Sequence, residues 1–403
     1  MNKQYDIIVF GATGFTGKCI SEYLARHLHS PNLRWAIAGR NLDRLTNLRA
    51  WLQAIHTRPT EIGLIVANIQ DPGSLVKMTE QAEVVLAAIG PYSLYGEPTI
   101  QACLQTNTHY LDLSGEPEFV DSVYVHFNQL ALEKGLLIIN CCGFESIPAD
   151  LGALFAVKTL QKQFDEVLIG KLAVKVEGFV RAEGKLSGGT WQSLITAFSR
   201  ALPYSKQKRL WRRNNQSASQ AMQYSVENVS PKLKFHKDLG FWSFPAPLID
   251  AYTVKRSAYL RGDYGAYFKY GHNFGTKKLT EMAAKATLLG GVFALSQLSF
   301  TRDWLRNFLP AGEGPTDKER QNGWFEIIFK AYARNKSVTV RVKGGDPGYS
   351  ETAKFACETA LSVVMDKDKL LPYRGVVTPA SVMGECLIER LQREGILFEV
   401  IKS

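Results

Sequence analysis

Three glycines near the start of the chain have the spacing of a phosphate-binding turn. They lie at positions 11, 14 and 17, between an apolar run and a segment with helical periodicity. Glycine lets a backbone turn tightly and approach a phosphate, and the free N–H groups of the following helix attract the anion. This order of strand, turn and helix gives such a pattern its meaning. We therefore predict that a dinucleotide pyrophosphate contacts Gly11, Thr13, Gly14, Phe15, Thr16 and Gly17.

A cation follows the second predicted strand, which covers residues 33–40 and ends in Gly39, Arg40 and Asn41. Sheets that bind NAD usually carry an acidic residue here, which accepts from a ribose hydroxyl. A guanidinium instead suits the 2′-phosphate of NADP. We therefore predict NADP(H) as the cofactor, with Arg40, Asn41 and Arg44 near that phosphate. The alternative is that Arg40 pairs with a surface carboxylate and that the glycine turn holds no ligand.

Two further contacts with the dinucleotide are expected at the ends of later strands. Asp71 follows the third strand and begins a helix, so it either caps that helix or contacts the adenine amine. Gly90 and Pro91 follow the fourth strand, and we expect them beside the nicotinamide half.

The residues that come next could carry the chemistry of hydride transfer. Tyr92 and Tyr95 could polarise a carbonyl or supply a proton, and Ser114 and Glu116 follow the fifth strand. The alternative for both tyrosines is that they line an apolar pocket.

Six strand–helix repeats must position these residues. The predicted strands cover 6–10, 33–40, 62–67, 83–89, 109–113 and 136–142, and nearly all of their residues are apolar. Such strands are typical of a parallel sheet that is covered on both faces. We therefore predict an α/β fold with a Rossmann-like, doubly wound parallel sheet, whose ligands lie off the carboxyl ends of the strands.

The pattern changes near residue 165. Residues 167–176 alternate as an antiparallel, half-buried strand does. We expect residues 1–160 to form the NADP-binding Rossmann domain. Residues 161–370 would form an α+β domain of mixed or antiparallel sheet for substrate binding and dimerisation. Residues 371–403 would pack back on the Rossmann domain.

The charge of the chain is unevenly divided. Residues 1–150 hold 10 Lys and Arg against 15 Asp and Glu, a net charge of −5, whereas the remainder holds 38 against 23, a net charge of +15. This excess suits an acidic substrate carrier or an anionic membrane. Candidate contacts are the basic run 206–213 and the uncharged run 286–301, which is short for a membrane span.

Several classes of site and location are not expected. The six cysteines have no CxxC pair, and the seven histidines have no HExxH motif, so we predict no metal. No nucleic-acid motif is present, so nucleic acid is not an expected partner. The first strand begins close to Met1 without a secretory signal, which favours a cytoplasmic protein with peripheral membrane contact as an option.

Nine motifs make the chain resemble the saccharopine dehydrogenase-like oxidoreductases, and within them the trans-acting enoyl reductase branch. They are GATGFTG (11–17), AGR (38–40), GPYSLYGEP (90–98), YLDLSGEPEF (110–119), CCGFESIPADLG (141–152), SGGTW (187–191), GEGP (312–315), GDPGYSETA (345–353) and GVVTPASVMG (375–384). The resemblance implies an NADP-type Rossmann domain and a mixed-sheet domain inserted after the sixth strand.

The same resemblance implies an NADPH-dependent reductase of an enoyl group on a lipid or acyl intermediate, in lipid or glycolipid biosynthesis and often at a membrane. The substrate could be carrier-linked, and a homodimer is an option. A second hypothesis is an amino-acid dehydrogenase, for which cations must clamp several carboxylates; Arg181, Lys185, Arg256 and Arg261 are the candidates. A third is a nucleotide-binding membrane scaffold without turnover.

Overall fold

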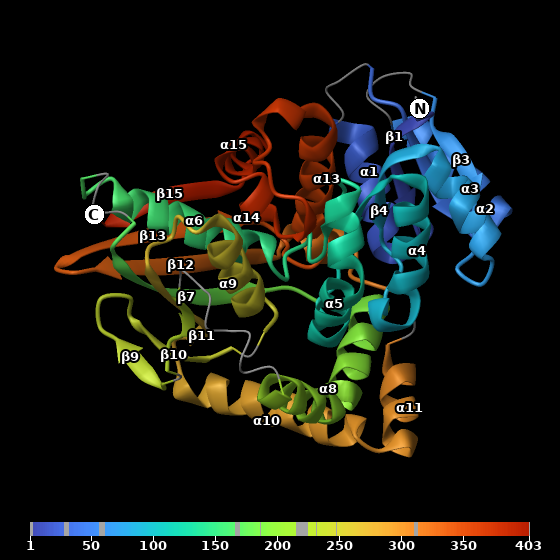
Figure 1. Cartoon of the computed structure of the whole chain (residues 1–403). Helices are drawn as coiled ribbons and strands as arrows, with labels where there is room; N and C mark the ends of the chain where they lie inside the picture. The colour runs from blue at the N-terminus through green and yellow to red at the C-terminus, as the bar shows by residue number, and fades with distance from the viewer. Residues whose placement is uncertain are drawn as a thin grey trace.

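The computed structural model (Figure 1) describes most of the chain. It covers residues 3–27, 32–55, 61–165, 170–185, 187–214, 225–230, 232–246, 248–309 and 313–402. Within 203–214 it describes only the helical backbone, so the side chains of the basic run 206–213 lie outside the described residues.

A seven-stranded parallel sheet forms the first unit, in the order β14-β6-β5-β4-β1-β2-β3. Its strands are β1 (Tyr5–Phe10), β2 (Trp35–Gly39), β3 (Gly63–Val66), β4 (Ala82–Ala87), β5 (His109–Asp112), β6 (Leu137–Ile139) and β14 (Gly375–Val377). This doubly wound sheet confirms the predicted fold class. The chain order reverses between β1 and β4, and ligands bind at such a reversal.

Helices cover both faces of this sheet. One apolar core joins it to α1 (Phe15–His27), α2 (Leu42–Ile55) and α13 (Ser350–Met365), and continues into α6 (Ile147–Gln161), which packs on the sheet of the second unit. A second core joins its other face to α3 (Pro72–Glu80), α4 (Tyr92–Thr106) and α5 (Pro117–Glu133). The strands are buried on both sides, which explains why their sequences are almost entirely apolar.

An eight-stranded mixed sheet forms the second unit, in the order β15-β13-β12-β7-β11-β10-β9, with β8 beside β11. Its strands are β7 (Ala173–Glu183), β8 (Ser225–Asn228), β9 (Lys234–His236), β10 (Phe241–Pro245), β11 (Tyr267–Thr276), β12 (Trp324–Ala333), β13 (Lys336–Gly344) and β15 (Leu397–Lys402). Strand β7 begins at Ala173. It is antiparallel to β12 but parallel to β11, so the predicted antiparallel pairing is correct on one side only.

The helices of the second unit fall into two groups. Helix α9 (Asp250–Arg261) packs against α6 and β11, and α12 (Asp317–Gln321) contacts α1. Helices α8 (Gly188–Asn214), α10 (Leu279–Ser296) and α11 (Ser299–Phe308) lie together at one end of the molecule (Figure 1). The run 286–301 is therefore divided between α10 and α11. No helix among the described residues has the length and hydropathy needed to cross a bilayer.

The last part of the chain joins both units. Besides α13, it contains a short 3-10 helix (Lys367–Lys369), α14 (Pro379–Val382) and α15 (Glu385–Arg393). Strand β14 joins the Rossmann sheet, but β15 pairs with β13 of the second sheet. Residues 371–403 thus do not pack on the Rossmann sheet alone, because β15 completes the edge of the other sheet.

A buried polar network fixes α13 against its neighbours. The Tyr23 hydroxyl of α1 donates to Glu358 (3.0 Å), and Arg390 of α15 donates to Glu358 (2.8 Å) and to Asp366 (2.9 Å). The Glu358 side chain is 5% exposed, and that of Arg390 14%. Removal of one partner from a buried ion pair leaves the other charge without compensation.

We therefore expect Arg390→Ala to lower the free energy of unfolding by about 3 kcal/mol. The matched control is Lys269→Ala, which removes the exposed ion pair with Glu227 (2.8 Å; side chains 51% and 55% exposed). This substitution should change the free energy of unfolding by less than about 1 kcal/mol. Urea denaturation followed by circular dichroism measures both. Equal effects would show that the network does not stabilise the contact between α1, α13 and α15.

Candidate functional site

The glycine turn after β1 allows no side chain at two positions. Gly11 has a φ of +85°, and a Cβ there would lie 2.4 Å from the carbonyl oxygen of Ala88. A Cβ at Gly17 would lie 2.2 Å from the carbonyl oxygen of Gly11. The Gly11 N–H donates to Ala38 (2.9 Å). The turn therefore draws the ends of β1, β2 and β4 together and directs the N-terminus of α1 toward the position of a ligand phosphate.

An open hollow of about 390 Å³ lies beside this turn. It is lined by Thr13, Lys18, Arg44, Asn47, Leu48 and Trp51. The Lys18 ammonium lies over the Trp51 ring, 4.4 Å from its centroid. Lys18 was not among the predicted contacts, because in sequence it is an ordinary lysine on the first turns of a helix. Its place in the hollow makes it a candidate for the 2′-phosphate.

The cations predicted for this phosphate lie where the sequence placed them. Arg40 is exposed at the end of β2, and Arg44 is exposed on α2 at the rim of the hollow. Neither Arg40 nor Arg44 forms an ion pair with a residue that the structure describes. The alternative that Arg40 pairs with a surface carboxylate therefore finds no support among the described residues. Asn41 Oδ1 accepts from the Arg44 N–H (2.9 Å), so this side chain caps α2.

Asp71 takes the role of a helix cap. Its Oδ1 accepts from the N–H groups of Gly73 (3.0 Å) and Ser74 (3.3 Å) at the start of α3. This geometry favours the capping interpretation, and the contact with adenine stays a prediction.

Gly90 and Pro91 leave β4 on the opposite half of the site. A Cβ at Gly90 would lie 3.1 Å from the Ser193 hydroxyl of α8. The segment that we predict beside the nicotinamide is therefore bordered by α8 of the second unit, and Ser193 is a polar neighbour of Gly90 that the sequence did not indicate.

The hydroxyl of Tyr92 already has structural partners, which favours the packing interpretation, and its catalytic role stays a prediction. Its side chain is buried, its hydroxyl donates to the Ala87 carbonyl (2.9 Å), and the same oxygen accepts from the Leu113 N–H (3.3 Å). Burial raises its pKa well above the usual value. Tyr95 lies one turn along α4 with 41% exposure and no hydrogen bond from its phenol to any described residue.

Ser114 and Glu116 are likewise used by the backbone. The Ser114 hydroxyl accepts from the Glu116 N–H (3.2 Å). The Glu116 carboxylate accepts from the N–H groups of Tyr92 (2.7 Å) and Ser93 (3.0 Å), so it caps α4 from a neighbouring loop. Both residues are buried. The predicted catalytic roles of Ser114 and Glu116 are therefore disfavoured, because their polar atoms already have structural partners.

A buried carboxyl group ties the ends of β5 and β6 together. Asp112 accepts from the N–H groups of Ser114 (3.0 Å) and Cys141 (3.2 Å) and from the side chain of Asn140 (2.7 Å). Burial raises its pKa to about 6, although these hydrogen bonds oppose the shift. Cys141 has a φ of +63°, which L-residues rarely adopt, and its N–H thereby points at Asp112.

Glu145 is a second carboxyl group in the loop after β6 that the sequence did not single out. It is only partly buried, and its Oε1 accepts from the Gly143 N–H (2.8 Å). Burial raises the pKa of Glu145 to about 7, with a smaller contribution from the charge of Asp112. The sequence contains a signal that could have identified Glu145, because this carboxylate follows the apolar strand predicted over residues 136–142. It was not selected as a catalytic candidate.

Segments of the second unit cover the glycine turn. The Phe15 ring meets Tyr349 edge to face (4.8 Å between centroids), and a Cβ at Gly314 would lie 2.5 Å from that ring. The Gly188 N–H at the start of α8 donates to the Glu313 carbonyl (2.9 Å). The motifs SGGTW, GEGP and GDPGY are distant in sequence, yet they meet here around one aromatic side chain.

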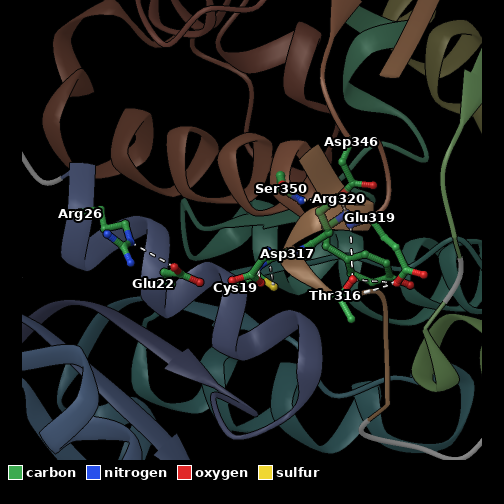
Figure 2. Close-up of polar contacts among 10 residues, drawn as sticks. Cys19, Glu22, Arg26, Thr316, Asp317, Glu319, Arg320, Asp346 and Ser350 are labelled. Carbon is green, nitrogen blue, oxygen red and sulfur yellow. Dashed lines mark hydrogen bonds and ion pairs between the residues drawn. The ribbon is translucent and has the colours of Figure 1, made fainter. Parts of the chain in front are cut away.

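Helix α12 continues this cover along α1 (Figure 2). Thr316 and Glu319 form a capping box at its start. Arg320 donates to Asp317 (2.6 Å) and contacts the sulfur of Cys19 on α1 (3.5 Å). The cover is therefore anchored on the same helix whose N-terminus faces the phosphate position.

Comparisons with known proteins agree with this geometry. A family model described as the saccharopine dehydrogenase NADP binding domain matches residues 7–139. A saccharopine dehydrogenase-like oxidoreductase of Bos taurus is 32% identical over 100% of this chain and 98% of its own. A protein of Mycobacterium tuberculosis named putative trans-acting enoyl reductase is 29% identical over 99% and 98%.

A solved structure shares the fold. It is apo saccharopine dehydrogenase (L-Glu forming) from Saccharomyces cerevisiae, with a TM-score of 0.53 and 14% identity, covering 98% of this chain and 100% of that one. Together with the family model, the cradle at Gly11 and Gly17 and the cations near β2 fit NADP(H), which is the cofactor of this chain.

Lys18→Ala and Arg40→Ala should each weaken NADPH binding by about 10-fold or more, because a hydrogen bond to a charged group contributes about 1.5–3 kcal/mol. NADH binding should change less than about 2-fold, since NADH lacks the 2′-phosphate. Fluorescence titration of both cofactors measures this, with Arg49→Ala on α2, outside the lining of the hollow, as the charge-matched control. An equal loss for NADH and NADPH would refute a role in holding the phosphate.

Proposed function

The chain belongs to the family of saccharopine dehydrogenase-like oxidoreductases, and from this premise we propose that it is an NADPH-dependent reductase of the C=C bond in an enoyl group. The substrate would be a lipid or acyl intermediate, carrier-linked or free, of lipid or glycolipid biosynthesis. The name of the mycobacterial relative supports the reaction type.

An apolar surface next to the nicotinamide half carries this proposal. Ile195 of α8, Val292 of α10 and Leu305 of α11 form one buried cluster, which places α10 and α11 against the helix that bears Ser193. Their outer faces remain apolar and exposed. These exposed side chains are Leu288, Leu289 and Leu295 of α10, Leu298 between the two helices, and Phe300, Trp304 and Phe308 of α11; Leu202 of α8 is exposed as well. Contiguous apolar surface of this kind marks an interaction site for a lipid or another apolar partner.

The amino-acid dehydrogenase hypothesis lacks its carboxylate clamp. Each of the four candidate cations has another partner. Arg181 pairs with Glu326 (3.3 Å), Lys185 with Glu319 (2.6 Å) and Arg261 with Asp263 (2.8 Å), while Arg256 donates to the Val376 carbonyl (3.3 Å) and stacks on Tyr124. A substrate with several carboxylates would have to displace these partners.

The residues of the site divide the work of the reaction. The N–H groups of residues 11–17 would hold the pyrophosphate, and Lys18, Arg40 and Arg44 the 2′-phosphate. Gly90, Pro91 and Ser193 would border the nicotinamide. When bound, NADPH supplies a hydride, and the protein must then exclude water and stabilise the enolate that forms on the substrate. The cover around Phe15 serves the exclusion of water.

The proposal is tested by mixing the purified protein with NADPH and a long-chain trans-enoyl thioester of coenzyme A. We expect NADPH consumption together with formation of the saturated thioester, identified by mass spectrometry. The saturated thioester, and NADH in place of NADPH, are the controls. Turnover that requires an amine and an oxo acid would favour the amino-acid dehydrogenase, and cofactor binding without turnover of any of these would favour a scaffold.

We further propose that the outer faces of α10 and α11 rest on an anionic membrane from which the substrate is taken. Residues 277–308 hold five Lys and Arg against two Asp and Glu, a net charge of +3. Lys277, Lys278 and Lys285 lie at or before the first turns of α10, whereas Arg302 and Arg306 alternate in sequence with the aromatic side chains of α11. Apolar burial and attraction to anionic lipid both stabilise an interfacial helix.

The triple substitution Phe300→Ser, Trp304→Ser and Phe308→Ser should lower binding to vesicles of phosphatidylcholine and phosphatidylserine by about 10-fold or more, since each large side chain contributes about 1.5–3 kcal/mol when buried. The control exchanges three exposed apolar residues of α5, Val125, Leu130 and Leu132, for serine. Vesicle sedimentation measures the binding. If the wild-type protein ignores vesicles and gel filtration shows a dimer that the triple variant loses, the surface joins two copies instead.

A further inference from the structure

Four carboxyl groups gather where β5, β6 and α9 meet, and only Glu145 among them is partly exposed. Asp112, Glu116 and Asp250 are 0%, 3% and 5% exposed, respectively. Asp112 and Glu116 are already occupied by the N–H groups described above. Glu145 is only partly buried and forms no ion pair in the part of the chain that the structure describes.

The loop around Glu145 is fixed from two sides. The preceding residue, Phe144, donates its N–H to the Thr352 hydroxyl of α13 (3.1 Å), and the following residue, Ser146, shares a hydrogen bond with Thr253 of α9 (2.9 Å between hydroxyls). Anchors on both neighbours hold the backbone of Glu145 in one conformation. A group that transfers a proton needs such positioning.

The side chain of Glu145 lies over glycines of two adjacent loops. Its Oε1 accepts from the Gly143 N–H, and a Cβ at Gly143 would lie 2.4 Å from Oε2. A Cβ at Gly115, in the loop after β5, would lie 3.8 Å from Cβ and Cγ of Glu145. Both loops leave the carboxyl edge on the β4–β5–β6 side, which is the nicotinamide half of a doubly wound sheet.

The surroundings favour the protonated form of Glu145. Some titratable groups shift the pKa of Glu145, or have their own pKa shifted by its charge. They are Asp112 of β5, Tyr92 of α4, Cys141 and Cys142 of its own loop, and Asp250 of α9. None of these is a cation. His272 of β11 lies 3.7 Å from Asp250, but burial lowers the pKa of this imidazole to about 4, so it adds no positive charge at neutral pH.

We propose that Glu145 is the acid that supplies the proton of the reduction. This proposal depends on the reductase function proposed above. The hydride adds to the β-carbon of the enoyl group, the C=C π electrons move to form the enolate, and the O–H bond of Glu145 breaks as its proton forms a C–H bond at the α-carbon. The products are the saturated acyl group, NADP⁺ and the Glu145 carboxylate, which recovers a proton from solvent.

Glu145→Gln is the primary test, because glutamine keeps an acceptor for the Gly143 N–H but has no acidic proton. Turnover of the trans-enoyl thioester should fall by about 100-fold or more, the usual contribution of a positioned acid. NADPH binding should change less than about 2-fold. The wild-type rate should decline as pH rises through about 7, where Glu145 loses its proton, and the variant should lack this limb. Unchanged turnover in the variant would overturn the proposal.

Two variants separate a proton donor from a structural residue. Glu145→Asp keeps the acid and should retain part of the turnover and the pH limb, whereas a purely structural role predicts equal losses for the aspartate and glutamine variants. Glu118→Gln removes a nearby surface carboxylate that pairs with Arg200 (3.0 Å) and should leave the rate unchanged. Equal losses in both Glu145 variants, or a loss in the Glu118 variant, would count against the proposal.

An infrared measurement distinguishes failure of this proposal from failure of the reductase function. Difference spectra between the wild-type protein and Glu145→Gln, both with NADP⁺, report the carboxyl band of Glu145 without turnover. We expect this band to disappear as the pH rises through about 7, whether or not an enoyl probe is reduced. If the band behaves so and no enoyl probe is reduced, only the proposed reaction type is wrong. A band that disappears near pH 4 would overturn the role of Glu145 whatever the substrate.

Discussion

The close approach of three strands at the glycine turn is the constraint on which the rest of the site depends. No Cβ fits at Gly11 or Gly17, because backbone atoms of Ala88 and of Gly11 itself occupy the space. This contact sets the direction of α1 and brings the exits of β2 and β4 to either side of it. The cations after β2 and the Gly90–Pro91 segment after β4 are consequences of that one turn.

Much of this half of the molecule could be predicted from the sequence. Six of the seven strands are apolar runs that alternate with helices, so they and the parallel sheet follow from the sequence pattern. The seventh strand, β14, comes from the far end of the chain and was not assigned to this sheet in advance. The same local reasoning placed Arg40 at the end of β2. Lys18 could not be found in this way, because its place in the hollow depends on the packing of Trp51 from another helix.

The catalytic candidates show where such reasoning ends. A tyrosine after a strand looks the same in sequence whether its hydroxyl faces a substrate or, as in Tyr92, a buried carbonyl. Glu116 was expected in the chemistry, yet two N–H groups of α4 occupy its carboxylate. The alternation of apolar and polar residues in β7 likewise indicated a strand with one buried face. It could not indicate that β11, almost a hundred residues later in the chain, runs parallel to β7. Each of these features is set by partners far away in the chain.

The two halves of the site differ in electrostatic character, and the difference suits a hydride transfer that is coupled to a proton transfer. Lys18 and Arg44 line the hollow beside the glycine turn and Arg40 follows β2, whereas the other half holds carboxyl groups whose pKa burial raises, to about 6 at Asp112 and about 7 at Glu145. Loss of a hydride gives the nicotinamide ring a positive charge, and loss of a proton gives Glu145 a negative one. If both occur in one cycle at a partly buried carboxyl group, the two charges are opposite in sign, and their attraction offsets part of the cost of burying each. A carboxyl group that was already ionised could not donate, and no cation is found among the described groups that influence the pKa of Glu145, which favours its protonated form.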